Sequence, residues 1–145
     1  MMKSKYEALD IAKYIIAYSA KQGYTITNLR LQKLLYFIYK KYLQMTDHNL
    51  FDDYIYAWEF GPTVSNIYFY FSNHAGIPLR NEYRIDELNI DKDTKQLINN
   101  IISQYKDMPI DRLIQISMKS HGAWDITFQK DEGSRIEPAL IKKEE

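Results

Sequence analysis

Three histidines, His48, His74 and His121, are the only imidazole side chains in this chain of 145 residues. They lie far apart and form no HExxH or other paired spacing that would direct two of them toward one zinc ion. The chain has no cysteine, which excludes disulfides, thiolate catalysis and cysteine-based zinc sites. We therefore expect no metal and no cofactor.

Other catalytic arrangements are also missing from the sequence. No serine lies in a GxSxG elbow, and the five glycines form no phosphate-binding loop. Asp52 and Asp53 are adjacent carboxylates ahead of a predicted strand, where neighbouring side chains point to opposite faces. We predict that the protein is not an enzyme.

The charges balance, with 19 basic and 19 acidic residues, so the whole chain has no field that attracts nucleic acid or an anionic membrane. The local exception is a group of basic residues on one side of a predicted helix, beside two aromatic residues: Arg30, Lys33, Lys40 and Lys41. Such a pattern can hold phosphates and stack bases, but a solvated helix face with tyrosines at its margins is the favoured interpretation. Nucleic-acid binding is therefore not the first expectation.

The hydropathy of the sequence contains no pattern typical of a membrane span or a signal peptide. No apolar run approaches the ~18 residues that a membrane span requires. The first ten residues, MMKSKYEALD, lack the apolar core of a signal peptide. We expect a cytoplasmic protein.

Apolar residues at helical spacing predict about five helices. They cover residues 7–21, a segment that follows Thr27, residues 64–75, a segment between Asp91 or Asp93 and Pro109, and residues 110–121. The clearest begins after Thr27, a good N-cap residue, and places Leu31, Leu34, Leu35, Ile38 and Tyr42 on one stripe.

Alternating residues predict two short strands, 53–60 and 80–90, which pair into a small sheet. Gly61 and Pro62 are expected to end the first strand and to start the next helix, because proline fits the first helical turn. Beyond Trp124 the chain becomes charged, and its last residues, LIKKEE, are expected to fray. The fold class is therefore a single compact, mainly α domain with a two-stranded β-sheet.

Seven of the 13 tyrosines lie in the segments LRLQKLLYFIYKKYL and DDYIYAWEFGPTVSNIYFYF. Most aromatic residues there, including Trp58 and Phe60, are expected in the core. Tyr36 and Tyr39, however, lie off the leucine stripe. Surface aromatics supply much of the energy of protein interfaces, about 2 kcal/mol each at hot spots. The residues alone therefore favour a binding module.

These two segments closely resemble the Panacea domain family, which comprises SocA-like antitoxins and phage-associated GepA-like proteins. The matching positions are Thr27, Asn28, Leu31, Gln32, Lys33, Leu34, Leu35 and Tyr36 in the helix, then Ala57, Trp58, Gly61, Pro62, Val64 and Tyr68. The family's histidine-to-tryptophan element falls on His121 and Trp124, with a shorter bridge than in relatives. The resemblance covers about residues 5–126 and implies a Panacea-like domain over 1–126, followed by a charged segment over 127–145.

The resemblance implies an antitoxin, encoded beside a toxin gene, that neutralises a cognate toxin by direct protein contact. The SocA type also delivers its toxin to a host protease as an adaptor. A phage or prophage protein that binds another host protein, and a DNA-binding regulator, are the alternatives that stay open.

The aromatic and basic residues outside the leucine stripe are the predicted partner-binding surface: Lys33, Tyr36, Tyr39 and Lys40. On this hypothesis, replacing Tyr36 and Tyr39 by alanine abolishes the complex without loss of stability. Changes at Trp58, Gly61 and Pro62 are expected to damage the fold instead, because these residues shape the turn after the strand.

Overall fold

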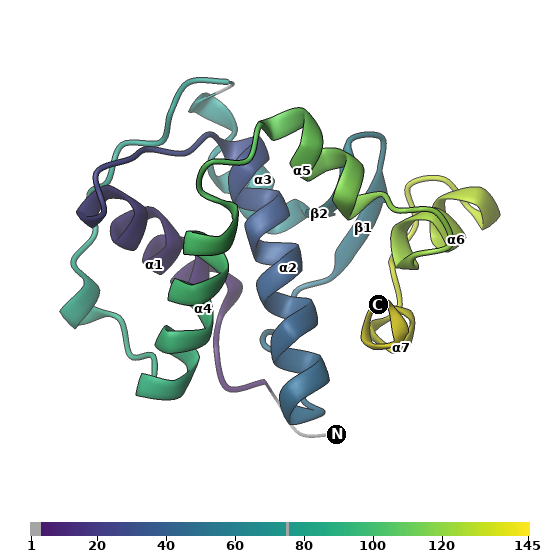
Figure 1. Ribbon diagram of the computed structural model, residues 1–145, viewed down its shortest axis with the longest axis horizontal. Helices are drawn as coiled ribbons and strands as arrows, with labels where there is room; N and C mark the ends of the chain where they lie inside the picture. Colours follow the sequence, from purple (N-terminus) through teal and green to yellow (C-terminus); the bar gives the residue numbers. More distant parts are fainter. Residues whose placement is uncertain (1–3, 75) are drawn as a thin grey trace.

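The fold is built around one long helix, α2, which the other elements surround (Figure 1). The computed structural model describes residues 4–74 and 76–145. Helices α1 and α4 pack on one side of α2, while the β-hairpin and α7 pack on the other. Helix α5 crosses the N-terminal end of α2. The apolar stripe of α2 is consequently enclosed, with Leu31, Leu35 and Ile38 fully buried.

The described residues form seven α-helices, five of them at least eight residues long. Their bounds are α1 Ala8–Lys21, α2 Asn28–Thr46, α3 Ser65–Tyr70, α4 Lys92–Tyr105, α5 Ile110–Ser117, α6 Ala123–Lys130 and α7 Pro138–Lys143. Two 3-10 helices, Ser72–His74 and Ile85–Glu87, lie in the segments that join α3 to α4. The prediction of a mainly α fold is confirmed.

Two helix starts follow from their capping residues. The Thr27 side chain accepts a hydrogen bond from the Arg30 backbone N–H at 3.2 Å. The Asp91 carboxylate accepts one from the Thr94 backbone N–H at 2.9 Å. Each cap satisfies an N–H that the first helical turn leaves unpaired, so α2 and α4 begin where the sequence predicts.

The sheet is a hairpin rather than a pairing of distant segments. Strand β1, Ile55–Trp58, runs antiparallel to β2, Gly61–Val64, with Trp58 opposite Gly61. Gly61 has φ +106°, a conformation that favours glycine in so short a connection. The two-stranded sheet is therefore confirmed, but its second strand was predicted in the wrong place.

Pro62 lies within β2 and does not begin a helix, which corrects the sequence prediction. It stands opposite Ala57, whose N–H donates to the Ser134 carbonyl and whose C=O accepts from the Gly133 N–H. Both backbone groups of Ala57 are thus occupied on the other side of β1, and the N–H that proline lacks is not needed. Helix α3 begins only at Ser65.

Residues 80–90 form no strand, which is a second correction. Their regular structure is the 3-10 helix Ile85–Glu87, and Tyr83 lies under the Lys13 ammonium, 5.4 Å from its ring centre. With β1 already flanked by β2 and residues 133–136, this segment has no free edge to join there. Helix α3 ends at Tyr70, and Ala75, where its end was predicted, lies outside the described residues.

The last residues do not fray, contrary to the sequence prediction. Ile136 donates its N–H to the Ile55 carbonyl, so the chain runs beside β1 before entering α7. Ile136 and Ile141 are buried in the common core, and Glu144 is 6% exposed. The segment is rich in charged residues, but its two isoleucines pack into the core and hold it against the rest of the domain.

Among the described residues, no helix combines the length and apolarity needed to cross a membrane.

Candidate functional site

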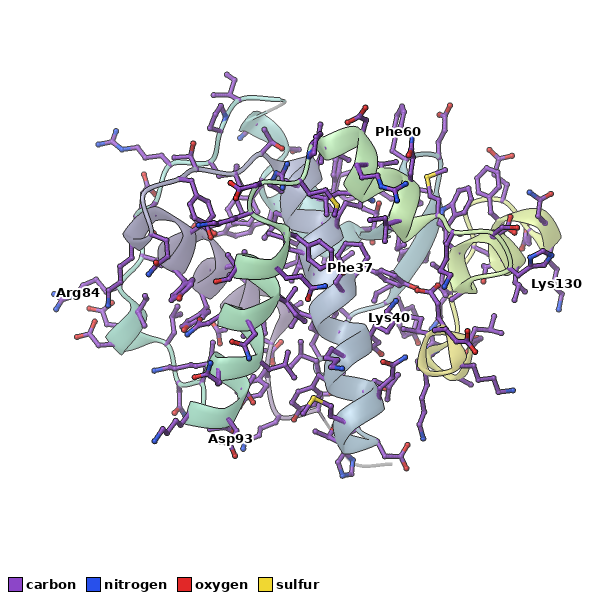
Figure 2. The ribbon with its side chains drawn as sticks, in the orientation of Figure 1. Phe37, Lys40, Phe60, Arg84, Asp93 and Lys130 are labelled. Carbon is purple, nitrogen blue, oxygen red and sulfur yellow. The ribbon has the colours of Figure 1, made fainter. Side chains whose placement is uncertain are left out.

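Several of the exposed aromatic residues lie on the hairpin and on α3. Phe60, in the hairpin turn, and Phe69, on α3, are each 62% exposed. The Trp58 ring lies edge-on to Tyr68, with centroids 5.4 Å apart, and 5.7 Å from Phe69. Figure 2 shows Phe60 at the outer edge of the molecule, far from Lys40 on α2. These rings form an accessible apolar surface of the kind from which interfaces draw energy.

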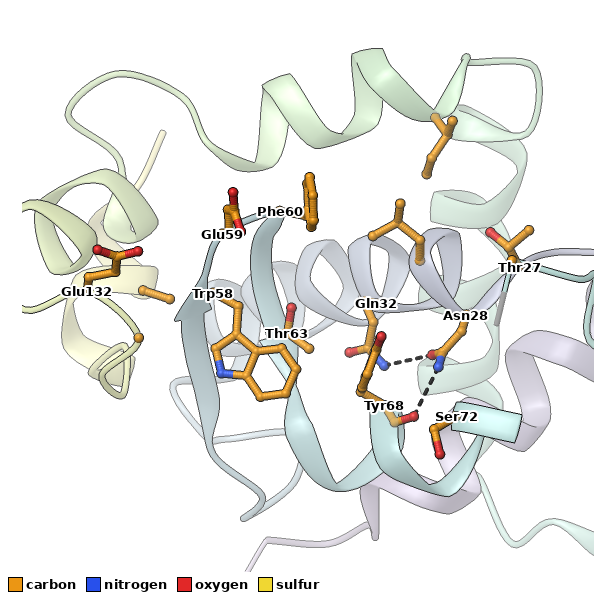
Figure 3. A pocket seen from close by; sticks show the side chains of 15 residues that line it. Thr27, Asn28, Gln32, Trp58, Glu59, Phe60, Thr63, Tyr68, Ser72 and Glu132 are labelled. Atoms are coloured by element: carbon orange, nitrogen blue, oxygen red, sulfur yellow. Dashed lines mark hydrogen bonds between the residues drawn. The ribbon is translucent and has the colours of Figure 1, made fainter. Parts of the chain in front are cut away.

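A groove of about 780 Å³ runs along this surface (Figure 3). The start of α2, the hairpin, α3, α5 and the loop before Ser134 contribute its walls. Its lining residues are Thr27, Asn28, Leu29, Gln32, Ala57, Trp58, Glu59, Phe60, Thr63, Tyr68, Ser72, Gly76, Ile110, Glu132 and Gly133. Six of them, Thr27, Asn28, Gln32, Ala57, Trp58 and Tyr68, are positions of the family motif recognised in the sequence.

Two buried amides hold the floor of the groove together. The Gln32 amide oxygen accepts from the Val64 N–H at 2.8 Å, and its nitrogen donates to the Asn28 oxygen at 3.1 Å. Asn28 in turn donates to the Tyr68 carbonyl at 3.0 Å. Because each polar group is paired, this chain of bonds fixes α2 to both β2 and α3. The groove is thus shaped before any partner arrives.

Lys33 lies beneath the hairpin and not at the surface, so its predicted outward orientation is wrong. Its side chain is fully buried, and its Nζ donates to the Pro62 carbonyl at 2.8 Å. Burial lowers the pKa of the Lys33 ammonium to about 7. A Cβ on Gly61 would approach Lys33 Nζ and the Ser117 hydroxyl to 2.8 Å each. A larger residue at 61 would therefore displace the Lys33 ammonium or the Ser117 hydroxyl, in addition to the strain from its positive φ.

Tyr36 and Lys40 are covered by the end of the chain, which corrects their predicted exposure as well. The Glu144 carboxylate accepts from the Tyr36 hydroxyl at 3.0 Å, from Lys40 Nζ at 2.6 Å and from the Ala123 N–H at 2.9 Å. Burial, together with the Glu144 charge, raises the pKa of Tyr36. We call this arrangement, formed by Tyr36, Lys40, Ala123 and Glu144, the carboxylate clasp.

Tyr39 is also in the interior, 3% exposed, with its ring centroid 5.0 Å from that of Phe51. Burial raises its pKa to about 12. The leucine stripe alone does not fill the space around α2, because α7 and the segment before β1 approach from the side where Tyr36 and Tyr39 project. That is why side chains off the stripe are core residues.

The basic side of α2 is not a solvated stripe. Arg30 donates to the carbonyls of Tyr105 and Met108, where α4 ends, and Lys40 is bound in the clasp. With Lys33 buried, Lys41 is left as the one exposed member of the group. In the folded protein, the basic residues of α2 therefore do not form one continuous exposed face that could bind phosphates.

His121 and Trp124 lie at the start of α6, away from the groove lining. The Trp124 ring N–H donates to the Trp58 carbonyl at 2.7 Å and so supports β1 from behind. His121 is exposed with φ +64°, and its backbone N–H donates to Asp125. Within residues 4–74 and 76–145, no three histidine, aspartate or glutamate side chains meet as metal ligands would.

Sequence reasoning missed several residues of the groove, above all Phe60, Ile110 and Glu132. Phe60 was expected in a strand and in the core, yet it occupies the hairpin turn. A large apolar residue directly before Gly-Pro was the available signal, because turn residues project from the surface. Glu132 lies 73 residues beyond Glu59 in the sequence, and only the fold places both in the lining of one groove.

Fold and site together define a mainly helical domain with an open aromatic groove. The sequence model of the family described as "Antitoxin SocA-like, Panacea domain" matches residues 31–125, and this chain belongs to that family. The chain is similar to Antitoxin SocA of Caulobacter vibrioides (strain NA1000 / CB15N), at 28% identity over 130 residues, covering 83% of this chain and 69% of that protein. No solved structure matches the chain.

Proposed function

We propose that this protein is an antitoxin that neutralises a cognate toxin by direct contact, and that the toxin binds at the aromatic groove. Family membership and the similarity to Antitoxin SocA support the role. The groove supports the location, because it unites exposed rings with positions of the family motif. The main observation in support of this binding site is that the large apolar side chain of Phe60 is 62% exposed in a hairpin turn.

Neutralisation by occlusion needs no chemistry from the antitoxin. An interface of ordinary size, about 1,600 Å² in total, is enough to cover an active site. The groove, its exposed rings and the neighbouring surface of α3 provide a pre-shaped centre for such an interface. The hydrogen-bonded amides of Asn28 and Gln32 already fix the groove floor. Binding would therefore cost the groove little conformational entropy, which favours affinity.

The test is growth of cells that co-express this protein with the small reading frame adjacent to its gene, followed by co-purification. We expect the neighbour to arrest growth alone, the wild type to restore it, and the two proteins to elute together. Phe60→Ala is expected to lose rescue and complex. Met45→Ala, which trims a side chain 66% exposed at the far end of α2, is expected to retain both.

Three outcomes would contradict the proposal in different ways. A harmless neighbour with no complex contradicts the antitoxin role and favours a different host protein, which an unbiased pull-down would identify. Rescue by Phe60→Ala equal to the wild type contradicts the groove as the binding site. Strongly salt-dependent binding to duplex DNA would favour the regulator. Toxin lifetime in the same cells separates simple occlusion from delivery to a protease.

A further inference from the structure

The groove is acidic as well as apolar. Two of its lining residues are glutamates, Glu59 and Glu132, and its lining contains no lysine, arginine or histidine. Both glutamates are exposed. In the part of the chain that the structure describes, neither carboxylate has a hydrogen-bond or ion-pair partner. This contrasts with Glu144, whose carboxylate is fully engaged in the clasp.

The acidic groups occupy one end of the groove. Figure 3 shows Glu59 and Glu132 on the side of Trp58, while Thr27 and Ser72 lie at the opposite end. The apolar rings of Trp58, Phe60 and Tyr68 lie between these ends. A ligand that follows the groove therefore meets carboxylates first and aromatic rings next.

We propose that the groove selects a basic, apolar segment of the toxin, in which an arginine or lysine lies next to aliphatic or aromatic side chains. This inference rests on the proposed function and names the chemistry of the partner. The cation would bind at the end of the groove that Glu59 and Glu132 line, beside Trp58, while the adjoining apolar side chains contact Phe60 and Tyr68. Carboxylates and an aromatic face attract the same cation, and both attractions strengthen as water is excluded.

The overall charge of the chain, zero by formal count, would not steer such a partner. The two free carboxylates provide local steering, and a like-charged acidic segment would be repelled. Selectivity thus resides in the groove and not in the net charge.

The experiment measures the dissociation constant of the purified complex by calorimetry at low and high salt. Glu59→Lys with Glu132→Lys is expected to weaken binding by at least about tenfold at low salt, and by less at high salt. Glu82→Lys with Glu145→Lys is the matched control, because it changes two exposed glutamates outside the groove by the same charge. We expect the control to stay within about twofold of the wild type.

Charge exchange decides whether the carboxylates touch the toxin directly. Each arginine and lysine of the toxin is replaced in turn by glutamate, and one such change is expected to restore binding to Glu59→Lys/Glu132→Lys. Urea unfolding of every variant confirms that folding is retained.

Unchanged binding by the groove double variant, with an intact wild-type complex, would overturn this inference while the antitoxin role stands. So would failure of every exchange to restore binding. If the wild type forms no complex, the role and the inference fail together. If sedimentation shows a dimer of this chain that Phe60→Ala dissociates, the groove's occupant is a second copy, which also overturns the inference.

Discussion

Helix α2 presents polar and aromatic side chains along the side that faces the hairpin and α7, and the fold treats the two ends of this side in opposite ways. Toward α7, Tyr36 is fully buried and its hydroxyl is bound in the carboxylate clasp. Toward the hairpin, Asn28 and Gln32 form the floor of a groove whose rings and carboxylates remain open. Richness in tyrosine therefore does not distinguish core from interface. The difference is whether another part of the same chain covers the residues.

The sharpest test of this comparison is Tyr36→Ala. We expect it to lower the free energy of unfolding by about 3–5 kcal/mol, because it empties a large buried space and removes a donor to Glu144. Urea denaturation measures the effect. An unchanged midpoint would restore the sequence hypothesis that Tyr36 is a surface residue.

Removal of the acceptor from the same side is expected to cost slightly less. Glu144→Ala leaves the Tyr36 hydroxyl, the Lys40 ammonium and the Ala123 N–H without their shared partner. We expect a loss of about 3 kcal/mol, at the lower end for a broken buried ion pair because Lys40 retains some access to water. Glu145→Ala, its exposed neighbour, should change stability by less than about 0.5 kcal/mol. Equal effects of the two variants in urea unfolding would contradict the clasp.

Lys33 lies between these two ends of the helix, and its burial predicts that stability depends on pH. The pKa of the Lys33 ammonium is 10.5 when the side chain is in water, as in the unfolded chain, and about 7 in the folded protein. From pH 7 to 10 the unfolded chain therefore binds more protons than the folded protein. Stability should therefore rise with pH across this window, by at most about 1.4 kcal/mol per unit, and the burial penalty should be complete below pH 7.

The measurement is urea unfolding at pH 7, 8 and 9, below the range in which the buried tyrosines titrate. Lys33→Met should flatten the rise, whereas Lys41→Met, at an exposed position of the same helix, should leave the slope unchanged. A rise of the same steepness in Lys33→Met would show that another group causes it.

The smallest expected effect on stability belongs to the groove. Phe60→Ala removes a ring that is 62% exposed, so we expect the free energy of unfolding to change by no more than about 0.5 kcal/mol. Its effect on the proposed complex with a toxin should nevertheless be large. Thermal unfolding beside the binding assay checks both, and a loss of several kcal/mol in stability would place Phe60 in the core after all.

Local patterns predicted the parts of the fold that local physics controls. Thr27 and Asp91 marked helix starts because a cap needs only its own first turn, and the leucines of α2 marked a stripe that is indeed buried. The hairpin was recognisable in principle, since Gly61 and Pro62 separate two short apolar runs. The expectation that proline starts a helix prevailed over the possibility that a strand accepts it opposite Ala57.

The site was less predictable because its residues meet only through distant contacts. Asn28, Gln32, Trp58 and Tyr68 were singled out by resemblance to the family, and they do converge on one groove. Lys33, Tyr36, Tyr39 and Lys40 were assigned to a surface because their covering partners are distant in the sequence or unmarked in it. The hairpin covers Lys33, and Phe51 packs against Tyr39. One buried carboxylate more than a hundred residues away binds Tyr36 and Lys40.

The carboxylate clasp also affects the order in which the parts of the protein fold during translation. Tyr36 and Glu144 are separated by 108 positions along the chain. Protein synthesis proceeds from the N-terminus, so the nascent α2 presents its tyrosine and lysine to the surroundings long before their carboxylate is translated. Contacts of such long sequence separation form late in folding. The most deeply buried tyrosine of the finished protein is therefore among the last to be shielded, and this part of α2 stays accessible to chaperones for much of translation.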